Sequence, residues 1–190
     1  APENTPQAAG CMMSQDVFVE VGHGPTLIDN NVMLSKASVR IATEGVACVH
    51  NLIAGAFTAV GNGTDMNVNG VNQPRYTPYH IRHRTEVAGF MTILHGDDRF
   101  YNNIFVQKYP VKEVEVKEDM GFMMADNQVV GTDVFDEYPT YDEWISWFEM
   151  DKPADMMKMT EYHFAHLPVW VNGNAYFNGA KACKNEKENL

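Results

Sequence analysis

A short corner that contains asparagine recurs along the chain and limits the fold more than any other feature. The corners lie at residues 28–32, 49–52, 101–104 and 171–175, and in each of them apolar residues flank Asn. In each of the first three corners, a residue of a strand-like run lies eleven positions before the last Asn. These residues are Glu20, Arg40 and Thr92. Because Asn31 and Asn51 are 20 positions apart, near one coil of a solenoid, the pattern predicts stacked coils.

Short apolar runs rich in β-branched residues surround these corners. They are residues 17–21, 26–28, 32–34, 38–42, 47–49, 90–94, 100–106 and 169–171. Short runs of this kind separated by Gly and Asn are typical of strands. Asn side chains at equivalent positions of stacked strands can hydrogen-bond to one another. The sequence therefore predicts an all-β solenoid, and the alternative is that Asn only marks turns.

Two insertions are expected within a solenoid domain of residues 15–181. Residues 56–84 are rich in Gly and Asn and then basic and aromatic, which predicts a loop. Residues 111–166 are acidic, and their parts 141–148 and 155–164 have the apolar spacing of helices, which predicts a short helical insertion. Three aromatic residues are expected to pack the first helix onto the solenoid: Trp144, Trp147 and Phe148. Residues 1–14 and 182–190 are expected to be irregular ends, and the polar tail to fray.

The net charge of −11 belongs to one segment. Residues 113–161 contain 14 acidic and 3 basic residues, whereas the rest of the chain contains 11 of each. The chain has no basic stripe, so we expect no nucleic-acid partner. It also has no apolar run near the roughly 18 residues of a membrane span, so we expect no membrane partner and a soluble protein. The three cysteines are widely spaced without a CxxC pair, which argues against a disulfide framework and slightly favours the cytoplasm.

Five motifs, in order along the chain, carry a resemblance to a known family. They are QDVFVEVGHGPTLIDNNVMLS at 15–35, HNLIAG at 50–55, TPYHxxHxTEVAG at 77–89, GDDRFYNNIFV at 96–106 and LPVWVNGNAYFNGAK at 167–181. Together they resemble glycoside hydrolase family 120, the β-xylosidases, over most of residues 15–181. The resemblance implies a right-handed parallel β-helix, of which 15–181 would be a partial domain. It also implies retaining hydrolysis of small xylo-oligosaccharides without a cofactor.

The same resemblance gives Glu20 the role of general acid/base. The nucleophile of the family is an Asp one coil earlier, farther upstream of Glu20 than the 19 residues that precede it here. The resemblance thus implies a fragment truncated at both ends, without its nucleophile coil and inactive by itself. From the residues alone, alternation places Val17, Val19 and Val21 on one face of a strand. Phe18 and Glu20 then share the other face, where Glu20 could also be an ordinary solvated carboxylate.

Four further residues are candidates for substrate binding: His23, His83, Glu86 and Asp97. His23 lies in GHGP after the Glu20 strand, where capping a turn is an equal alternative. The loop with His83 and Glu86 departs from the family-like form YHxPHSTE, because Arg82 and Arg84 replace Pro and Ser. Glu86 is expected either to bind sugar hydroxyls or to stabilise a turn. Asp97 is expected either to contact ligand or to orient loops.

One further carboxylate and two histidine pairs are candidates for catalysis or metal binding. Glu44 follows Glu20 by 24 residues and is a candidate partner carboxylate, although the matching strand position is expected at Arg40 or Ile41. The pairs His80/His83 and His163/His166 have the spacing of metal ligands on a helix, but no acidic third ligand is implied and we expect no metal.

Two other functions remain open at this point. One is a non-catalytic carbohydrate-binding or pseudoenzyme remnant. The other is a polysaccharide lyase on the same architecture, which would require a Ca²⁺ site and a basic residue over an acidic sugar. In each case the exposed edges of the outer coils are expected to favour self-association.

Overall fold

The computed structural model describes residues 15–20, 22–58, 66–68, 71–73, 76–81, 83–113, 128–148 and 165–190. Within these residues the regular structure is almost entirely strand, and most strand pairs are parallel. The predicted all-β class is therefore confirmed. No helix of the described part is long and apolar enough to cross a membrane.

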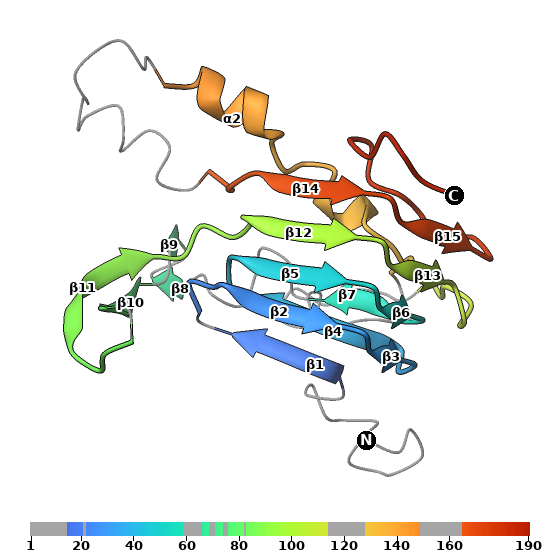
Figure 1. Cartoon of the computed structure of the whole chain (residues 1–190), viewed down its shortest axis with the longest axis horizontal. Helices are drawn as coiled ribbons and strands as arrows, with labels where there is room; N and C mark the ends of the chain where they lie inside the picture. The colour runs from blue at the N-terminus through green and yellow to red at the C-terminus, as the bar shows by residue number, and fades with distance from the viewer. Residues whose placement is uncertain are drawn as a thin grey trace.

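Three parallel sheets form the body of the molecule (Figure 1). Sheet A contains β1 (Gln15–Glu20), β4 (Ala37–Ala42) and β7 (Ala56–Thr58). Sheet B contains β2 (Thr26–Asp29), β5 (Val46–Val49), β12 (Asp98–Tyr101) and β14 (Val169–Asn172). Sheet C contains β3 (Val32–Met33), β6 (Leu52–Ile53), β13 (Ile104–Val106) and β15 (Ala175–Phe177). The chain passes through A, B and C twice and enters A a third time at β7; within the described residues, the pairs β12–β13 and β14–β15 then add strands to B and C only.

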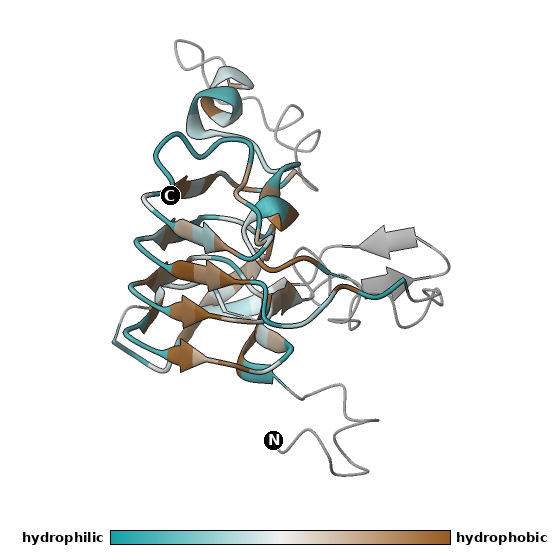
Figure 2. Cartoon of the chain, turned by 90° about the vertical axis from the view of Figure 1, so that its right-hand side faces the viewer, coloured by the Kyte–Doolittle hydropathy of each residue, from teal (hydrophilic) through white to brown (hydrophobic). Residues whose placement is uncertain are grey.

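Four aromatic rings fill the space between the sheets. Phe57, Phe100, Phe105 and Phe135 are all fully buried. The Phe57 ring centroid lies 5.3 Å from that of Phe100 and 5.8 Å from that of Phe105. Figure 2 shows the hydrophobic strands stacked above one another with hydrophilic turns beside them. Phe57 belongs to β7, so the segment expected to be a loop insertion begins with a core strand that pairs with β4.

The asparagines of the corners form a hydrogen-bonded ladder, as predicted. The side-chain Nδ2 of Asn31 donates to Asn51 Oδ1 at 3.2 Å, and Asn51 Nδ2 donates to Asn103 Oδ1 at 3.0 Å. Asn103 Nδ2 donates to Asn174 Oδ1 at 3.0 Å. The backbone N–H of each of these three donors points to the same acceptor as its side chain. Each coil thus donates two hydrogen bonds to the following one.

Glu186 occupies the position after the last asparagine. Its Oε1 accepts from the backbone N of Asn174 at 3.0 Å and from Asn174 Nδ2 at 2.9 Å. Its Oε2 accepts from the hydroxyl of Tyr176 at 2.6 Å. The tail was expected to fray because its sequence is polar, but Glu186 is buried and bound. A buried donor pair requires an acceptor, and this carboxylate supplies it.

Two smaller elements project from the sheets. The hairpin of β10 (Tyr76–His80) and β11 (Val87–Thr92) is antiparallel and extends beyond one end of the sheets (Figure 1). A second antiparallel pair consists of β8 (Met66–Val68) and β9 (Val71–Gln73).

The acidic segment supplies a short helix, as predicted. Helix α2 (Tyr141–Ser146) begins with a capping box in which Thr140 and Glu143 exchange hydrogen bonds. It approaches sheet B through Tyr141, whose ring centroid is 6.3 Å from that of Trp170. Trp144 packs on Phe148 at 5.0 Å. The predicted second helix at 155–164 lies outside the described residues.

Candidate functional site

Glu20 is the last residue of β1, at an edge of sheet A. Val17 and Val19 pack against the core, whereas the Phe18 ring faces outward under the Arg40 guanidinium at 4.5 Å. The predicted alternation is therefore confirmed for the described part of this strand, and Glu20 is exposed on the outer face. Among the described residues, no strand pairs with the other edge of β1.

The residue beside Glu20 on the next coil is Ala42. The register of β1 and β4 pairs Glu20 with Ala42 and Phe18 with Arg40. The expectation that Arg40 or Ile41 matches Glu20 is therefore wrong. The reason is the corner after the strand, because five residues separate β1 from β2 whereas three separate β4 from β5. The spacing between Asn31 and Asn51 does not reveal this difference, because the longer corner precedes Asn31 and lies outside that interval.

His23 lies in that longer corner and is held through both ring nitrogens. Its Nδ1 is 2.8 Å from Glu44 Oε1, and its Nε2 is 2.8 Å from Thr77 Oγ1. Glu44 Oε2 also accepts from the backbone N of Leu94 at 3.0 Å. The His23 and Glu44 side chains are only 15% and 11% exposed. Glu44 is thus a buried partner of His23 in the neighbouring corner rather than the neighbour of Glu20 in the sheet.

Asp97 occupies the equivalent corner of the following coil. Its backbone N donates to Pro168 O, and its φ of 54° is in the left-handed region. Its Oδ1 lies 2.9 Å from Arg99 Nη1 in a partly exposed ion pair. Asp97 and His23 therefore lie on one column of corners between sheets A and B, two coils apart. The second oxygen of Asp97, Oδ2, lies beside Gly45 of the preceding corner, and the side chain is partly exposed.

His83 and Glu86 lie in the turn of the β10–β11 hairpin, away from this column. Both are exposed, and His83 has a φ of 60°. Glu86 pairs with Arg84, with 2.7 Å between Glu86 Oε1 and Arg84 Nη2. Arg84 is one of the two residues that depart from the family-like form of this loop. The structure therefore brings together Glu20, His23 and Asp97 at one end of the sheets and leaves His83 and Glu86 on the projecting arm.

Residue Thr77 was missed by sequence reasoning. It is buried on β10, and its hydroxyl is the partner of His23 although the two are separated by 54 residues. Nothing local in the sequence around Thr77 marks this contact. The only signal was the TPYH motif itself, which drew attention to His80 and His83 instead.

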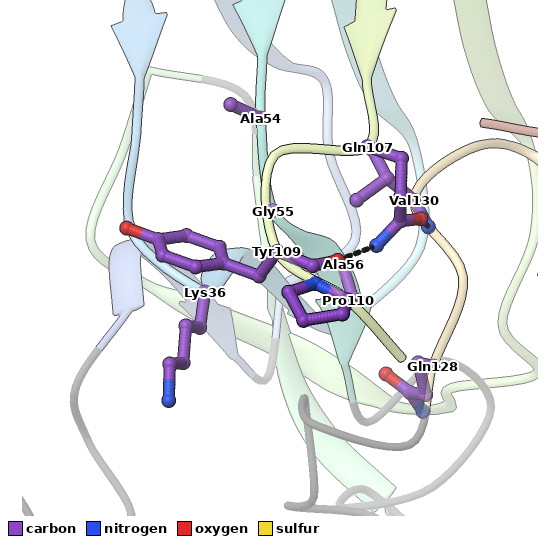
Figure 3. Close-up of a pocket in the computed structure, with 9 residues that line it drawn as sticks. All are labelled: Lys36, Ala54, Gly55, Ala56, Gln107, Tyr109, Pro110, Gln128 and Val130. Atoms are coloured by element: carbon purple, nitrogen blue, oxygen red, sulfur yellow. Dashed lines mark hydrogen bonds between the residues drawn. The ribbon is translucent and has the colours of Figure 1, made fainter. Parts of the chain in front are cut away.

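Two hollows lie elsewhere on the surface. An open groove of about 360 Å³ follows the corners between sheets B and C and is lined by Asn30, Asn31, Val32, His50, Asn51, Leu52, Asn102 and Ile104. The other hollow lies at the corner that enters β4 and β7, and its lining includes Lys36, Gly55, Gln107, Tyr109 and Gln128 (Figure 3). No carboxylate lines either hollow in the described part of the chain, so neither supplies an acid/base pair.

Comparison with solved structures gives one informative similarity. The chain is similar to XylC in the structure of its complex with xylose, with 37% sequence identity and a TM-score of 0.65. The alignment covers 93% of this chain and 23% of the XylC chain, so the chain spans less than a quarter of the length of the protein it matches. The aligned residues of this chain therefore share the fold of the matched part of XylC. No protein-family model and no curated protein matches the chain.

Proposed function

We propose that this chain is part of a retaining, β-xylosidase-like glycoside hydrolase of family 120. In this proposal the three sheets are the faces of a right-handed parallel β-helix of residues 15–181. Within residues 56–84 the insertion follows β7, residues 111–166 carry the second insertion, and 1–14 and 182–190 are its ends. The similarity to XylC in complex with xylose carries the proposal, because 37% identity extends over nearly the whole chain. The proposed substrate is a short xylo-oligosaccharide, and no cofactor or metal is required.

Glu20 is the proposed general acid/base. In the first step Glu20 protonates the glycosidic oxygen while a second carboxylate attacks the anomeric carbon and the alcohol departs. In the second step Glu20 takes a proton from water, which displaces the carboxylate and releases the sugar. Its position supports this role, because an exposed carboxylate at the end of β1 is open to a ligand on the outer face of sheet A.

The second carboxylate is proposed to come from a strand on the side of β1 opposite β4, where no described strand pairs. Adjacent strands are about 4.8 Å apart, and retaining glycosidases hold their carboxyl groups roughly 5–5.5 Å apart. On the β4 side, the residue paired with Glu20 is Ala42, whose side chain has no carboxyl group. The proposed fragment is therefore inactive until a coil with the nucleophile is added.

The remaining substrate contacts are proposed as follows. Asp97 lies in the corner column two coils from His23, is partly exposed, and is proposed to accept a hydrogen bond from a sugar hydroxyl. His83 and Glu86 are proposed to contact sugar from the hairpin, on which both are exposed. His23 is proposed to support the pocket rather than to touch the sugar, because both of its ring nitrogens are already bound.

Kinetics of a longer gene product that includes the preceding coil test the proposal. With an aryl β-xyloside as substrate, Glu20→Gln is expected to lower kcat about 10²–10⁴-fold, the usual contribution of a general acid/base. Asp142→Asn, which removes an exposed carboxylate on α2, serves as the matched control and is expected to retain full activity. Full activity in Glu20→Gln would sink the assignment.

A chemical rescue sharpens this result. A residue that serves as base in the second step can be bypassed by azide, which is an anionic nucleophile and needs no deprotonation. Glu20→Ala is therefore expected to form xylosyl azide from an aryl xyloside with a good leaving group. The 190-residue chain alone is expected to release no product, and clear turnover by it would show that the nucleophile lies within the chain.

A non-catalytic carbohydrate-binding protein is the second candidate. The observation that favours it is the pairing of Glu20 with Ala42, which leaves one carboxylate where hydrolysis needs two. In that case xylose added to the 190-residue chain should shift NMR signals around Glu20 and Asp97, while the longer product should show no Glu20-dependent hydrolysis.

A further inference from the structure

The corner beside Glu20 is tied to both strands of the β10–β11 hairpin. His23 Nε2 reaches the hydroxyl of Thr77 on β10, and Glu44 Oε2 reaches the backbone N of Leu94, two residues after β11. The bond of 2.8 Å between His23 and Glu44 joins the two contacts. The base of the hairpin is therefore held at both of its ends by one pair of side chains.

The chemistry of His23 and Glu44 determines which atom donates in each hydrogen bond. A carboxylate only accepts hydrogen bonds, so the Nδ1 of His23 carries the proton that faces Glu44. In the neutral ring the Nε2 of His23 is then an acceptor for the hydroxyl proton of Thr77. Each oxygen of Glu44 serves one donor, Nδ1–H of His23 or N–H of Leu94. Each hydrogen-bond donor among His23, Glu44 and Thr77 thus has an acceptor, and the three side chains are largely buried.

The backbone under this pair is hydrogen-bonded to the neighbouring corners. Glu44 forms a parallel bridge with Gly96, and its N–H donates to the Gly22 carbonyl. Thr43, the residue before it, accepts from the backbone N of Gly22 at 2.8 Å. Glu44 and His23 are therefore anchored in the stacked corners, whereas the hairpin extends away from them.

Most of the large apolar side chains on the described part of the hairpin are exposed. Phe90 is 70% exposed, and Val87, Met91 and Tyr79 are also exposed. A two-stranded ribbon is marginally stable in water unless it packs on something. Its orientation therefore depends on how its base is attached.

We propose that His23, Glu44 and Thr77 form a pin that positions the β10–β11 hairpin relative to Glu20. His23 follows Glu20 by three residues, and the hairpin lies at the same end of the sheets as the C-terminal end of β1 (Figure 1). The pin couples the arm that carries His83 and Glu86 to the corner next to the acid/base. This role for the arm rests on the proposed function, whereas the pin itself does not. His23 and Glu44 are positioning residues and not sugar ligands.

Hydrogen exchange of the 190-residue chain, followed by mass spectrometry or NMR, tests the pin. Thr77→Val keeps the shape of the side chain and removes its hydroxyl, so the amides of residues 76–94 are expected to exchange about fivefold faster, as for loss of one buried hydrogen bond. Thr77→Ser restores the hydroxyl and is expected to restore protection. Thr85→Val is the matched control, because Thr85 is exposed at the tip of the same hairpin.

Glu44→Gln probes the other half of the pin. An amide has one acceptor oxygen where two donors converge, so either His23 Nδ1–H or Leu94 N–H loses its partner. Exchange of residues 76–94 is expected to rise at least tenfold, as for a hydrogen bond to a charged group. Glu86→Gln at the exposed tip is its control. Combined with Thr77→Val, the effect is expected to be smaller than the product of the two, since the groups act as one unit.

A spectroscopic measurement separates the pin from general stabilisation. The ¹⁵N shifts of the His23 ring are expected to report a protonated Nδ1 in the wild-type chain and an altered tautomer balance in Glu44→Gln. Unchanged exchange in Thr77→Val and Glu44→Gln would disprove the pin, as would an equal rise in β12 and β13. If the pin is found while Glu20→Gln remains fully active in the longer product, the pin stands and the glycosidase proposal falls.

Discussion

Asp98 is a carboxyl group in an unusual environment. It is 1% exposed, and its Oδ1 accepts from the backbone N of Val46 at 2.8 Å. Burial raises the pKa of Asp98 well above its ordinary value, and the neighbouring carboxylates of Asp97 and Glu44 raise it further. The hydrogen bond from Val46 and the charge of Arg99 oppose this shift without cancelling it. Folding therefore favours the protonated form of Asp98.

This shift has a definite consequence for stability. A group whose pKa is higher in the folded chain stabilises it below the unfolded pKa, and that contribution is lost as pH rises through the folded pKa. Asp98→Asn keeps an acceptor for Val46 and cannot ionise, so its free energy of unfolding is expected to fall less than that of the wild type as pH rises above 4. Urea denaturation at a series of pH values measures this difference. A wild-type dependence that is identical to that of Asp98→Asn would contradict it.

Single residues differ in how far the sequence alone reveals their surroundings. The outward face of Glu20 could be predicted, because alternation along a strand is local and the valines mark the buried side. The contacts of His23 could not, because its partners lie 21 and 54 residues away and are set by the stacking of coils. Neither of the two roles expected for His23, ligand contact and turn capping, named Glu44 or Thr77 as its partner.

At the scale of elements, the asparagine ladder is the feature that both predicts and stabilises the coils. Asn103 is buried, accepts from the N and Nδ2 of Asn51, and donates to the Cys48 carbonyl and to Asn174. Asn31 at the outer coil is exposed and no described residue donates to its Oδ1. Loss of the asparagine side chain is therefore expected to lower the free energy of unfolding more at Asn103 than at Asn31.

Asn103→Ala is expected to destabilise the chain by about 3 kcal/mol or more, because each buried group left without a partner costs roughly 1–3 kcal/mol. Asn31→Ala is the matched control and is expected to cost about 1 kcal/mol or less, since water can replace its bonds. Chemical denaturation of the two variants measures the difference. Equal losses would show that the ladder is not what holds the coils.

Elements were predictable where their residues obey a local pattern. The strands from Thr26 to Val49 follow from β-branched runs, and α2 follows from apolar spacing after a proline. Strand β7 escaped prediction because AGAFT has a single large apolar residue, and only the surrounding aromatic rings make Phe57 a core residue. The register of β1 with β4 escaped because the corner length changes between coils.

At the scale of the whole molecule, the two ends of the stack differ. At one end β1, β2 and β3 are edge strands, and Leu27 and Val32 are 64% and 69% exposed on them. At the other end the tail covers the last coil, where Leu190 exchanges backbone hydrogen bonds with Asn174 and Tyr176. Unpaired edges with apolar side chains tend to associate. We therefore propose that the chain self-associates through the β1–β2–β3 end.

Light scattering of the 190-residue chain tests this proposal, with a dimer or larger species as the expected result. The double variant Leu27→Lys/Val32→Lys is expected to shift the population to monomer, because charge on an edge strand opposes pairing. Phe177→Lys replaces a residue that is 50% exposed on β15 at the covered end and is expected to leave association unchanged. A monodisperse wild-type monomer would refute the proposal.

The ladder that ends at Glu186 resembles a polymer with one growing end and one terminating group. The side-chain amide of each asparagine donates to the oxygen of the next one. The carboxylate of Glu186 accepts from Asn174 but has no proton to donate, so the series ends there. At Asn31, by contrast, no described residue donates to Oδ1, so this oxygen can accept hydrogen bonds from the asparagine of one more coil. One carboxylate therefore sets the direction in which this stack of parallel strands can be extended, and extension past β15 first requires that Glu186 be replaced by a residue whose side chain both accepts and donates.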